Sequence, residues 1–215
     1  MKNLLSFKGD ILTTLQPNAL VSKVDFFTTM ANVFVKKAIV NLKDGSINSD
    51  YQIKVADLNK LFDLTNTKMQ GKIQIDGTAS ITKDMIITGT SNIFAGKLDF
   101  KLKNDDFSAM VKNIEVKSLT HMLFYPQVFD SRANATVTYN LAKATGIVDA
   151  TLLKGHFLPN KFSSVLNQFA KFDLTKEVYD SVNIKSNIDK DIIKSTVDMK
   201  SKLTTITVPY STIDN

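Results

Sequence analysis

Polar and apolar residues alternate along most of the chain, in short stretches that are separated by small turn clusters. In the clearest stretch, 71–82, every second residue belongs to the apolar or small set Gly71, Ile73, Ile75, Gly77, Ala79 and Ile81. An alternation of period two predicts a β-strand with one polar and one apolar face. Many such strands in succession predict an antiparallel sheet whose apolar face is either covered or used.

The whole pattern predicts about a dozen strands and a few short helices. Asp44-Gly45 and the polar cluster at 104–106 are typical of hairpin turns. Asp57, Ser118 and Asn160 each precede apolar positions spaced three and four apart, which predicts three helices with these residues as N-caps. We therefore expect a mainly β fold: an elongated, curled antiparallel sheet, or β-groove, with two to four short inserted helices.

The organisation along the chain predicts one domain over residues 1–215. No linker or low-complexity tract interrupts it, and a capped helix precedes an alternating hairpin at both 57–81 and 118–141, which indicates a loose repeat. The segment 1–10 lacks the apolar core of a signal peptide, and we find no transmembrane helix. We expect the chain to be a segment of a longer protein.

The basic charge does not point to a nucleic-acid partner. The formal net charge is +6, but the lysines are scattered over polar strand positions, as at Lys97, Lys101, Lys103 and Lys112. Binding of nucleic acid favours clustered arginines with exposed aromatic residues, and Arg132 is the chain's single arginine. We expect no nucleic-acid partner.

The sequence also contains no recognisable catalytic motif. His121 and His156 do not form a pair with metal-ligand spacing. Ser80-Ile81-Thr82-Lys83 matches a nucleophile motif by letters, but it runs from a strand into a turn where the motif requires a helix. We therefore expect a protein without enzymatic activity, cofactor or metal.

Two explanations of the apolar face remain open. It could pack into a filled core, as in a structural or adhesive protein with a protein partner, or it could form an open trough that holds acyl chains. Small residues on this face, such as Gly77, Ala79 and Ala135, predict unfilled volume and favour the trough. The predicted lining residues are Ile53, Val55, Ile73, Ile75, Ala79, Ile81, Leu98, Phe100, Leu102, Ala135, Val137, Tyr139, Ile184 and Val197.

Two parts of the chain share a plan in which a short leucine-containing helix precedes alternating strands. One part runs from Asp57 to Gly77 and the other from Val116 to Phe157. In the second, the plan lies in Leu119-Thr120-His121-Met122-Leu123-Phe124-Tyr125-Pro126, Phe129-Asp130-Ser131-Arg132-Ala133 and Val137-Thr138-Tyr139-Asn140-Leu141. This plan resembles the repeated unit of the bacterial AsmA-like family of β-groove envelope proteins.

The resemblance implies a non-enzymatic groove segment that binds and conducts phospholipid or another acyl-chain lipid, in support of outer-membrane biogenesis in a diderm cell envelope. It implies a periplasmic location, with an inner-membrane anchor in parts of the protein outside this chain. A soluble periplasmic shuttle for lipoprotein or lipopolysaccharide remains an alternative, as does the structural protein with a filled core. The sequence identifies no protein partner.

Overall fold

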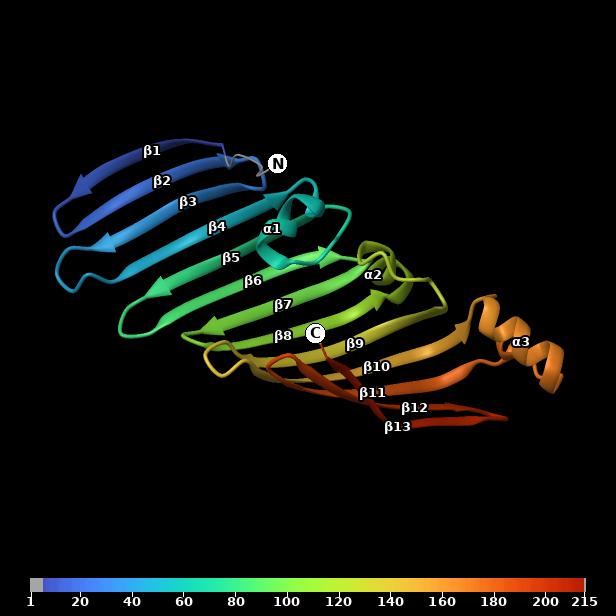
Figure 1. Ribbon diagram of the computed structural model, residues 1–215. Coiled ribbons are helices and arrows are strands. Elements are labelled where there is room, and N and C mark those ends of the chain that lie inside the picture. The colour runs from blue at the N-terminus through green and yellow to red at the C-terminus, as the bar shows by residue number, and fades with distance from the viewer. Residues whose placement is uncertain (1–5, 215) are drawn as a thin grey trace. The chain divides into compact units, whose positions relative to one another are not determined.

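The computed structural model describes residues 6–214 of the chain, so the first five residues of the N-terminal segment lie outside the described part. It shows a mainly β protein with 13 antiparallel strands in one sheet and three short α-helices. The strands follow one another across the sheet in chain order (Figure 1). The predicted mainly β class, the antiparallel order and the number of inserted helices are thereby confirmed.

The strands are of similar length, eight to thirteen residues. They are β1 (Phe7–Gln16), β2 (Ala19–Thr28), β3 (Asn32–Asn41), β4 (Ile47–Val55), β5 (Ile73–Ile81), β6 (Met85–Ile93), β7 (Gly96–Lys103), β8 (Asp106–Glu115), β9 (Phe129–Asn140), β10 (Thr145–Phe157), β11 (Tyr179–Asp189), β12 (Ile192–Ser201) and β13 (Thr205–Asp214). The sheet is open, with β1 and β13 as its edges, and the curl that we expected of it is not borne out.

Short helices interrupt the strands at three places. They are the 3₁₀ turn η1 (Leu58–Leu61) with α1 (Phe62–Thr65), α2 (Val116–Met122), and α3 (Lys161–Ala170) followed by the 3₁₀ turn η2 (Leu174–Lys176). The structure contains no helix, among the residues that it describes, with the length and apolar character needed to cross a membrane.

Two of the three predicted helix caps are confirmed. The Asp57 side chain accepts a hydrogen bond from the backbone of Asn59, and Asn160 forms a reciprocal capping box with Ser163. The prediction for Ser118 is wrong, because α2 begins at Val116 and Ser118 lies inside it. The Ser118 hydroxyl donates instead to the carboxylate of Glu115. Glu115 is the last residue of β8, and α2 follows it without a loop.

Contacts divide the chain into two compact units, which we describe separately. The first unit runs to Asn92 and includes Asp99–Asn104, and the second comprises Ile93–Leu98 and the chain from Asp105 onward. The single domain and its repeat structure, as expected from the sequence, are not tested by this division and stay predictions.

The strand register gives the first unit one apolar and one polar face. Opposed residues share a face, and Val33, Ile53 and Ile75 lie opposite one another on neighbouring strands. The other face carries hydrogen-bonded polar pairs, such as the hydroxyls of Thr78 and Thr88 at 2.8 Å. The alternation of period two in the sequence therefore predicted the two faces correctly.

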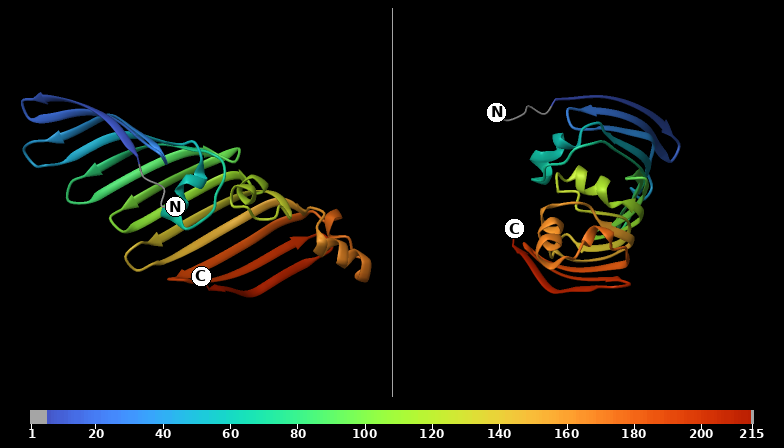
Figure 2. Two further views of the ribbon diagram at one scale, coloured as in Figure 1. Left: turned by 45° about the horizontal axis from the view of Figure 1, so that its top comes forward. Right: turned by 90° about the vertical axis from the view of Figure 1, so that its right-hand side faces the viewer.

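The second unit has the same arrangement over β8 to β13. Ala109, Val137 and Val148 lie opposite one another on three neighbouring strands, and further on Ile184 opposes Val197. The strands of this unit lie side by side in both views of Figure 2, and α2 and α3 follow the ends of β8 and β10. We call the end of the second unit that carries α2, α3 and η2 its helix end.

The hydrophobic core of the second unit lies at this helix end. Its buried members are Ile114, Ala133, Leu152, Tyr179, Val182 and Met199. Tyr179 is fully buried, and its ring packs edge-on against Phe157, with ring centroids 5.7 Å apart. Val116 and Leu119 of α2 pack against the same cluster. The helices thus cover only part of the apolar face.

Candidate functional site

Eleven of the fourteen predicted lining residues lie where the register gives the strands their apolar faces, and the other three lie on β7. In the first unit, Ile53 opposes Ile75, Val55 opposes Ile73, and Ser49 opposes Ala79. Ile81 ends the same row opposite Met85. Phe100 belongs to this unit as well, and its ring touches the backbone position of Gly89 on β6. Leu102 lies two residues from Phe100 on β7, so it shares that face of the strand.

In the second unit, the register brings the other predicted residues together. Ala135 opposes Val111 and Ala150, and Val137 opposes Ala109 and Val148. Tyr139 opposes Phe107, and Ile184 opposes both Ala150 and Val197. Leu98 lies on β7 at the start of this unit, and the register of the described pairs does not assign it a partner.

Exposure of these residues shows how far each apolar face is covered. Val55 is buried at 5% exposure, and Ile81 is exposed at 43%. The other twelve predicted residues fall between these classes. Side chains of a filled core would be buried throughout, so the described structure leaves these rows partly open to solvent. In the second unit the partly open residues include Ala135, Val137, Ile184 and Val197, of which Ile184 and Val197 also pack against the core at the helix end. We call these four residues the open apolar face.

Gly77 does not leave the unfilled volume that we expected of it, and Gly146 in the second unit is filled in the same way. A Cβ built on Gly77 would stand 2.6 Å from the ring of Tyr51, and one on Gly146 would stand 2.7 Å from the ring of Tyr139. Aromatic rings from the opposed strand thus fill the space over these glycines. The prediction for Gly71 is also wrong, because it lies in the loop before β5, at φ +102°. The apolar faces are partly exposed because no other element within residues 6–214 covers them completely, and not because glycines leave gaps in them.

A few hydroxyl groups interrupt the apolar rows. Ser186 and Ser195 oppose each other on β11 and β12, and their hydroxyls lie 2.8 Å apart in a hydrogen bond. Ser131 is buried at 7% exposure, and its hydroxyl has no hydrogen-bond partner in the structure. In the first unit, Tyr51 satisfies its own hydroxyl by donating to the Thr88 carbonyl at 2.9 Å, and burial raises the pKa of Tyr51.

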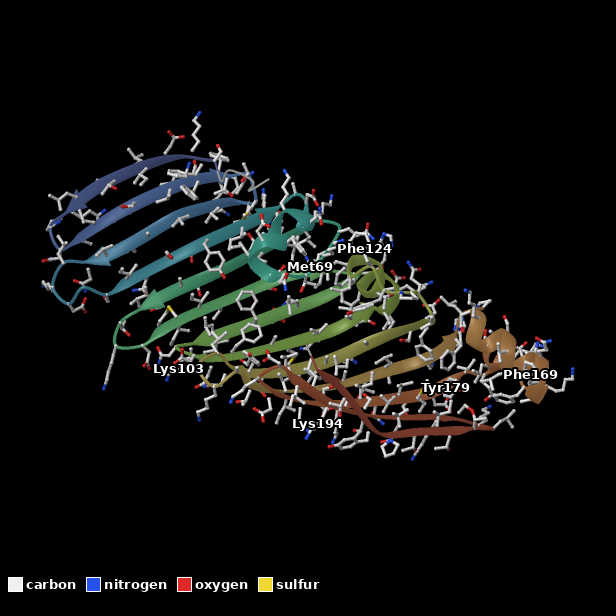
Figure 3. All side chains as sticks on the ribbon, viewed as in Figure 1. Met69, Lys103, Phe124, Phe169, Tyr179 and Lys194 are labelled. Atoms are coloured by element: carbon white, nitrogen blue, oxygen red, sulfur yellow. The ribbon has the colours of Figure 1, made fainter. Side chains whose placement is uncertain are left out.

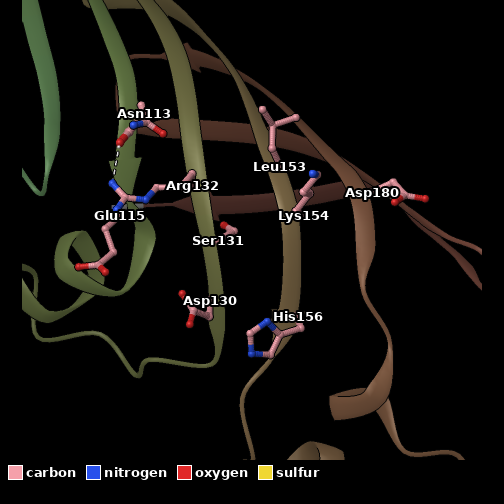
Figure 4. Close-up of a pocket in the computed structure, with 9 residues that line it drawn as sticks. All are labelled: Asn113, Glu115, Asp130, Ser131, Arg132, Leu153, Lys154, His156 and Asp180. Atoms are coloured by element: carbon pink, nitrogen blue, oxygen red, sulfur yellow. Dashed lines mark hydrogen bonds between the residues drawn. The ribbon is translucent and has the colours of Figure 1, made fainter.

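A hollow of about 550 Å³ lies in the second unit, mostly among residues of the polar face (Figure 4). It is lined by Asn113, Glu115, Asp130, Ser131, Arg132, Leu153, Lys154, His156 and Asp180. Two register shifts form its walls, one between Val111 and Ile114 on β8 and the other between Leu153 and His156 on β10. Such bulges bend a strand locally and re-aim its side chains.

Two of the charged groups that line this hollow, Arg132 and Asp130, have partners within the protein. The Arg132 guanidinium donates to the backbone carbonyls of Asn113, at 3.0 Å, and Ala95, at 3.2 Å. Lys117 Nζ lies 2.8 Å from the Asp130 carboxylate, and this hydrogen bond raises the pKa of Lys117. The side chains of this hollow therefore support the bulges, and none of these three groups is left to bind a ligand.

A second hollow of similar size, about 520 Å³, is lined by residues such as Met110, Thr136 and Asp149. It too lies mainly on the polar face, since Met110 opposes Thr136, which opposes Asp149. Within residues 6–214, no group of three histidine, aspartate or glutamate side chains is placed to hold a metal ion. The open apolar face is thus the best candidate for a binding surface.

Sequence reasoning did not identify the role of Arg132. The sequence showed only a single arginine at a polar position of an alternating strand; its position next to Asn113, which adopts a positive φ of 53°, is seen only in the structure. Comparison of the chain with family models, with curated proteins and with solved structures found no match. Functional conclusions therefore depend on the chain's own residues.

Proposed function

We propose that this protein binds acyl chains of phospholipid or a similar lipid on the apolar faces of its sheet. The observation that supports this most strongly is the partial exposure of apolar residues aligned across successive strands of each unit, among them Val137, Ile184 and Val197. An apolar surface aligned in this way is costly to leave in water, since each methylene group removed from water contributes about 0.8 kcal/mol. An acyl chain that lies across the strands would cover it.

The chemistry of the face matches an acyl chain better than a polar ligand. Residues opposed to Val137 are alanine and valine, and over the described strands β8 to β13 no charged residue occupies the rows that contain Ala135, Val137 and Ile184. The only polar groups noted there are hydroxyls such as the paired Ser186 and Ser195. The AsmA-like resemblance supports the same proposal, and with it a role as a lipid-conducting segment in a diderm envelope. We further propose that the protein is not an enzyme.

Lipid extraction combined with native mass spectrometry tests this proposal. Protein purified from a diderm host should carry phospholipid, and Val137→Asp should remove it, because an ionised carboxylate is costly to place beside an acyl chain. Thr138→Asp is the matched control, since Thr138 is the next residue on β9, is exposed and lies on the polar face opposite Ser108 and Ile147. Circular dichroism shows whether each variant is folded.

The result that supports the proposal is loss of lipid from Val137→Asp with retention in Thr138→Asp. A lipid-free wild-type protein, or equal retention in both folded variants, would support the alternative of a structural protein. If Val137→Asp does not fold, Ala150→Phe serves as the second variant, since it fills the neighbouring row without adding charge. Lipid retained at the wild-type level by a folded Ala150→Phe protein would also count against the proposal.

A further inference from the structure

Exposed apolar side chains gather at the helix end of the second unit. In α3, Val165 is 50% exposed and Phe169 is 79% exposed. Figure 3 labels Phe169 near the outer end of this helix and Phe124, which is 58% exposed, beyond α2. The helix packs on the protein through its other side, since Ser163 is buried at 3% exposure. Val165 and Phe169 therefore form an exposed apolar strip on α3, beside the exposed polar residues Lys161, Ser164 and Gln168.

Other segments bring further apolar residues to the same end. Phe129 opposes Phe157, Gly155 opposes Tyr179, and Tyr179 opposes Ser201, so the starts of β9 and β11 and the end of β12 lie together. Val178, directly before β11, is 54% exposed. Leu203, in the turn that follows β12, is 80% exposed. These residues belong to one end of the sheet although they are far apart in sequence.

Lysines outnumber acidic residues at this end, since the segments 158–180 and 200–204 contain five lysines against Asp173, Glu177 and Asp180. The segment 158–172, which contains α3, has Lys161 and Lys171 as its only charged residues, and Lys202 precedes Leu203 in the β12–β13 turn. Of the acidic groups nearby, Asp173 pairs with Lys176 at 3.6 Å and Glu177 accepts a hydrogen bond from the Ser201 hydroxyl, while Asp180 is exposed. Lys161, Lys171 and Lys202 are exposed.

The opposite end of the same unit differs in charge. Its turns contain Asp105, Asp106, Asp189 and Asp191, against Lys143 and Lys190. Four aspartates and two lysines give these turns a net charge of −2, whereas five lysines and three acidic residues give the segments 158–180 and 200–204 of the helix end a net charge of +2. The two ends of the unit therefore differ in their attraction to a negatively charged surface.

From this combination we infer that the helix end of the second unit docks on an anionic lipid bilayer. A helix with a basic rim and exposed Phe and Val on one side inserts the apolar side at the boundary between headgroups and acyl chains, while its lysines meet anionic headgroups. Phe169, Val165 and Leu203 insert, and Lys161, Lys171 and Lys202 contact the headgroups. This inference does not depend on lipid binding by the open apolar face, which lies on the strands.

Vesicle sedimentation tests the inference with the whole chain. The protein should sediment with vesicles of phosphatidylcholine and phosphatidylglycerol, and much less with vesicles of phosphatidylcholine alone. Lys161→Gln and Lys171→Gln should each weaken binding about fivefold, and added salt should weaken it further because the attraction is electrostatic. Val165→Ser with Phe169→Ser should abolish it. Since both residues are exposed, these variants should fold normally.

The control pair is Leu141→Ser with Ile147→Ser, at the acidic end, where the two residues are 53% and 54% exposed. Three results would each overturn the inference: an equal loss of vesicle binding in the α3 pair and the control pair, binding to neutral vesicles as strong as to anionic ones, or no binding to anionic vesicles. The α3 variant should keep any lipid that co-purifies, and Val137→Asp should keep its vesicle binding. Failure of bilayer docking is thereby distinguished from failure of acyl-chain binding.

Discussion

The ring of Phe100 lies across Gly89 on the neighbouring strand, so closely that a Cβ on Gly89 would stand 2.3 Å from the ring. Tyr51 covers Gly77 and Tyr139 covers Gly146 in a similar way. Glycine in a strand interior usually weakens the strand, because it adds no side chain to the packing. Here an aromatic ring from the adjacent strand supplies that packing, so each pair of residues works as a unit.

The pairing of Phe100 with Gly89 predicts strong coupling between substitutions at the two positions. Gly89→Ala should lower the free energy of unfolding by about 1–3 kcal/mol, because the new methyl group overlaps the ring. Phe100→Leu should make Gly89→Ala better tolerated, since the close atoms at Gly89 all belong to side chains. Urea denaturation of the two single variants and the double variant measures this coupling, and additive losses would contradict the pairing.

Arg132 is expected to stabilise the bulge in β8 through the Asn113 carbonyl and the turn before β7 through the Ala95 carbonyl. Arg132→Lys should lower the free energy of unfolding by about 1 kcal/mol, since an ammonium group does not reproduce the planar fork that reaches both acceptors. The control is Lys185→Gln on the same unit, where the cation is 70% exposed and 3.9 Å from Asp149. That variant should change stability by less than about 0.5 kcal/mol. Equal effects in the two variants would refute the special role of Arg132.

Asp76 predicts a pH dependence of stability. Hydrogen bonds from Gln74 at 2.9 Å and Gln52 at 2.6 Å hold the pKa of Asp76 below its ordinary value of 3.8. A carboxyl group whose pKa is lower in the folded state stabilises the fold above its unfolded pKa. This stabilisation is lost as the pH falls through the folded pKa. Asp76→Asn should therefore reduce the loss of stability below about pH 4.

The cause of the Asp76 shift can be measured directly by NMR titration of its carboxyl carbon. Gln74→Leu and Gln52→Leu should each raise the pKa of Asp76 towards 3.8. A wild-type pKa at or above 3.8 would contradict this account of the polar face, as would a pKa that neither variant changes.

Tyr179 is expected to be the most important single side chain of the core at the helix end. It is fully buried and packs against Phe129 and Phe157, with centroid distances of 6.2 and 5.7 Å. Tyr179→Ala should cost about 4 kcal/mol, as expected for loss of a buried aromatic residue. Tyr210→Ala, at a site that is 66% exposed, should cost less than about 0.5 kcal/mol. Thermal melts that show similar losses for both would contradict this description of the core.

The strands and their faces could be predicted from the sequence because the pleat of a strand has a fixed period of two. Ile73 and Ile75 needed no tertiary information to be placed on one face. The Asp44-Gly45 turn was also readable, since Gly45 adopts the positive φ of 71° that glycine accepts readily. The cap at Asn160 followed from its position before apolar residues with helical spacing.

Other features depended on which strands lie opposite one another, and the alternation within one strand does not contain that information. The sequence alone suggested unfilled volume at Gly77, because glycine has no side chain. The register shows that Tyr51 lies opposite it and fills this volume. The bulge at Asn113 and its support by Arg132 require the pairing of β8 with β9. The α2 helix begins three residues before the predicted start at Leu119, directly after β8, and Ser118 inside it donates a hydrogen bond to Glu115.

A single tryptophan offers the most direct measurement of acyl-chain binding, because the chain has no tryptophan of its own. Val137→Trp places the reporter on the open apolar face, and Thr138→Trp places it on the polar face of the same strand. Phospholipid with brominated acyl chains, added to folded protein, should quench the fluorescence of Trp at position 137 and leave that at position 138 nearly unchanged. Equal quenching at both positions, or none at position 137, would contradict the proposal that the apolar face holds lipid.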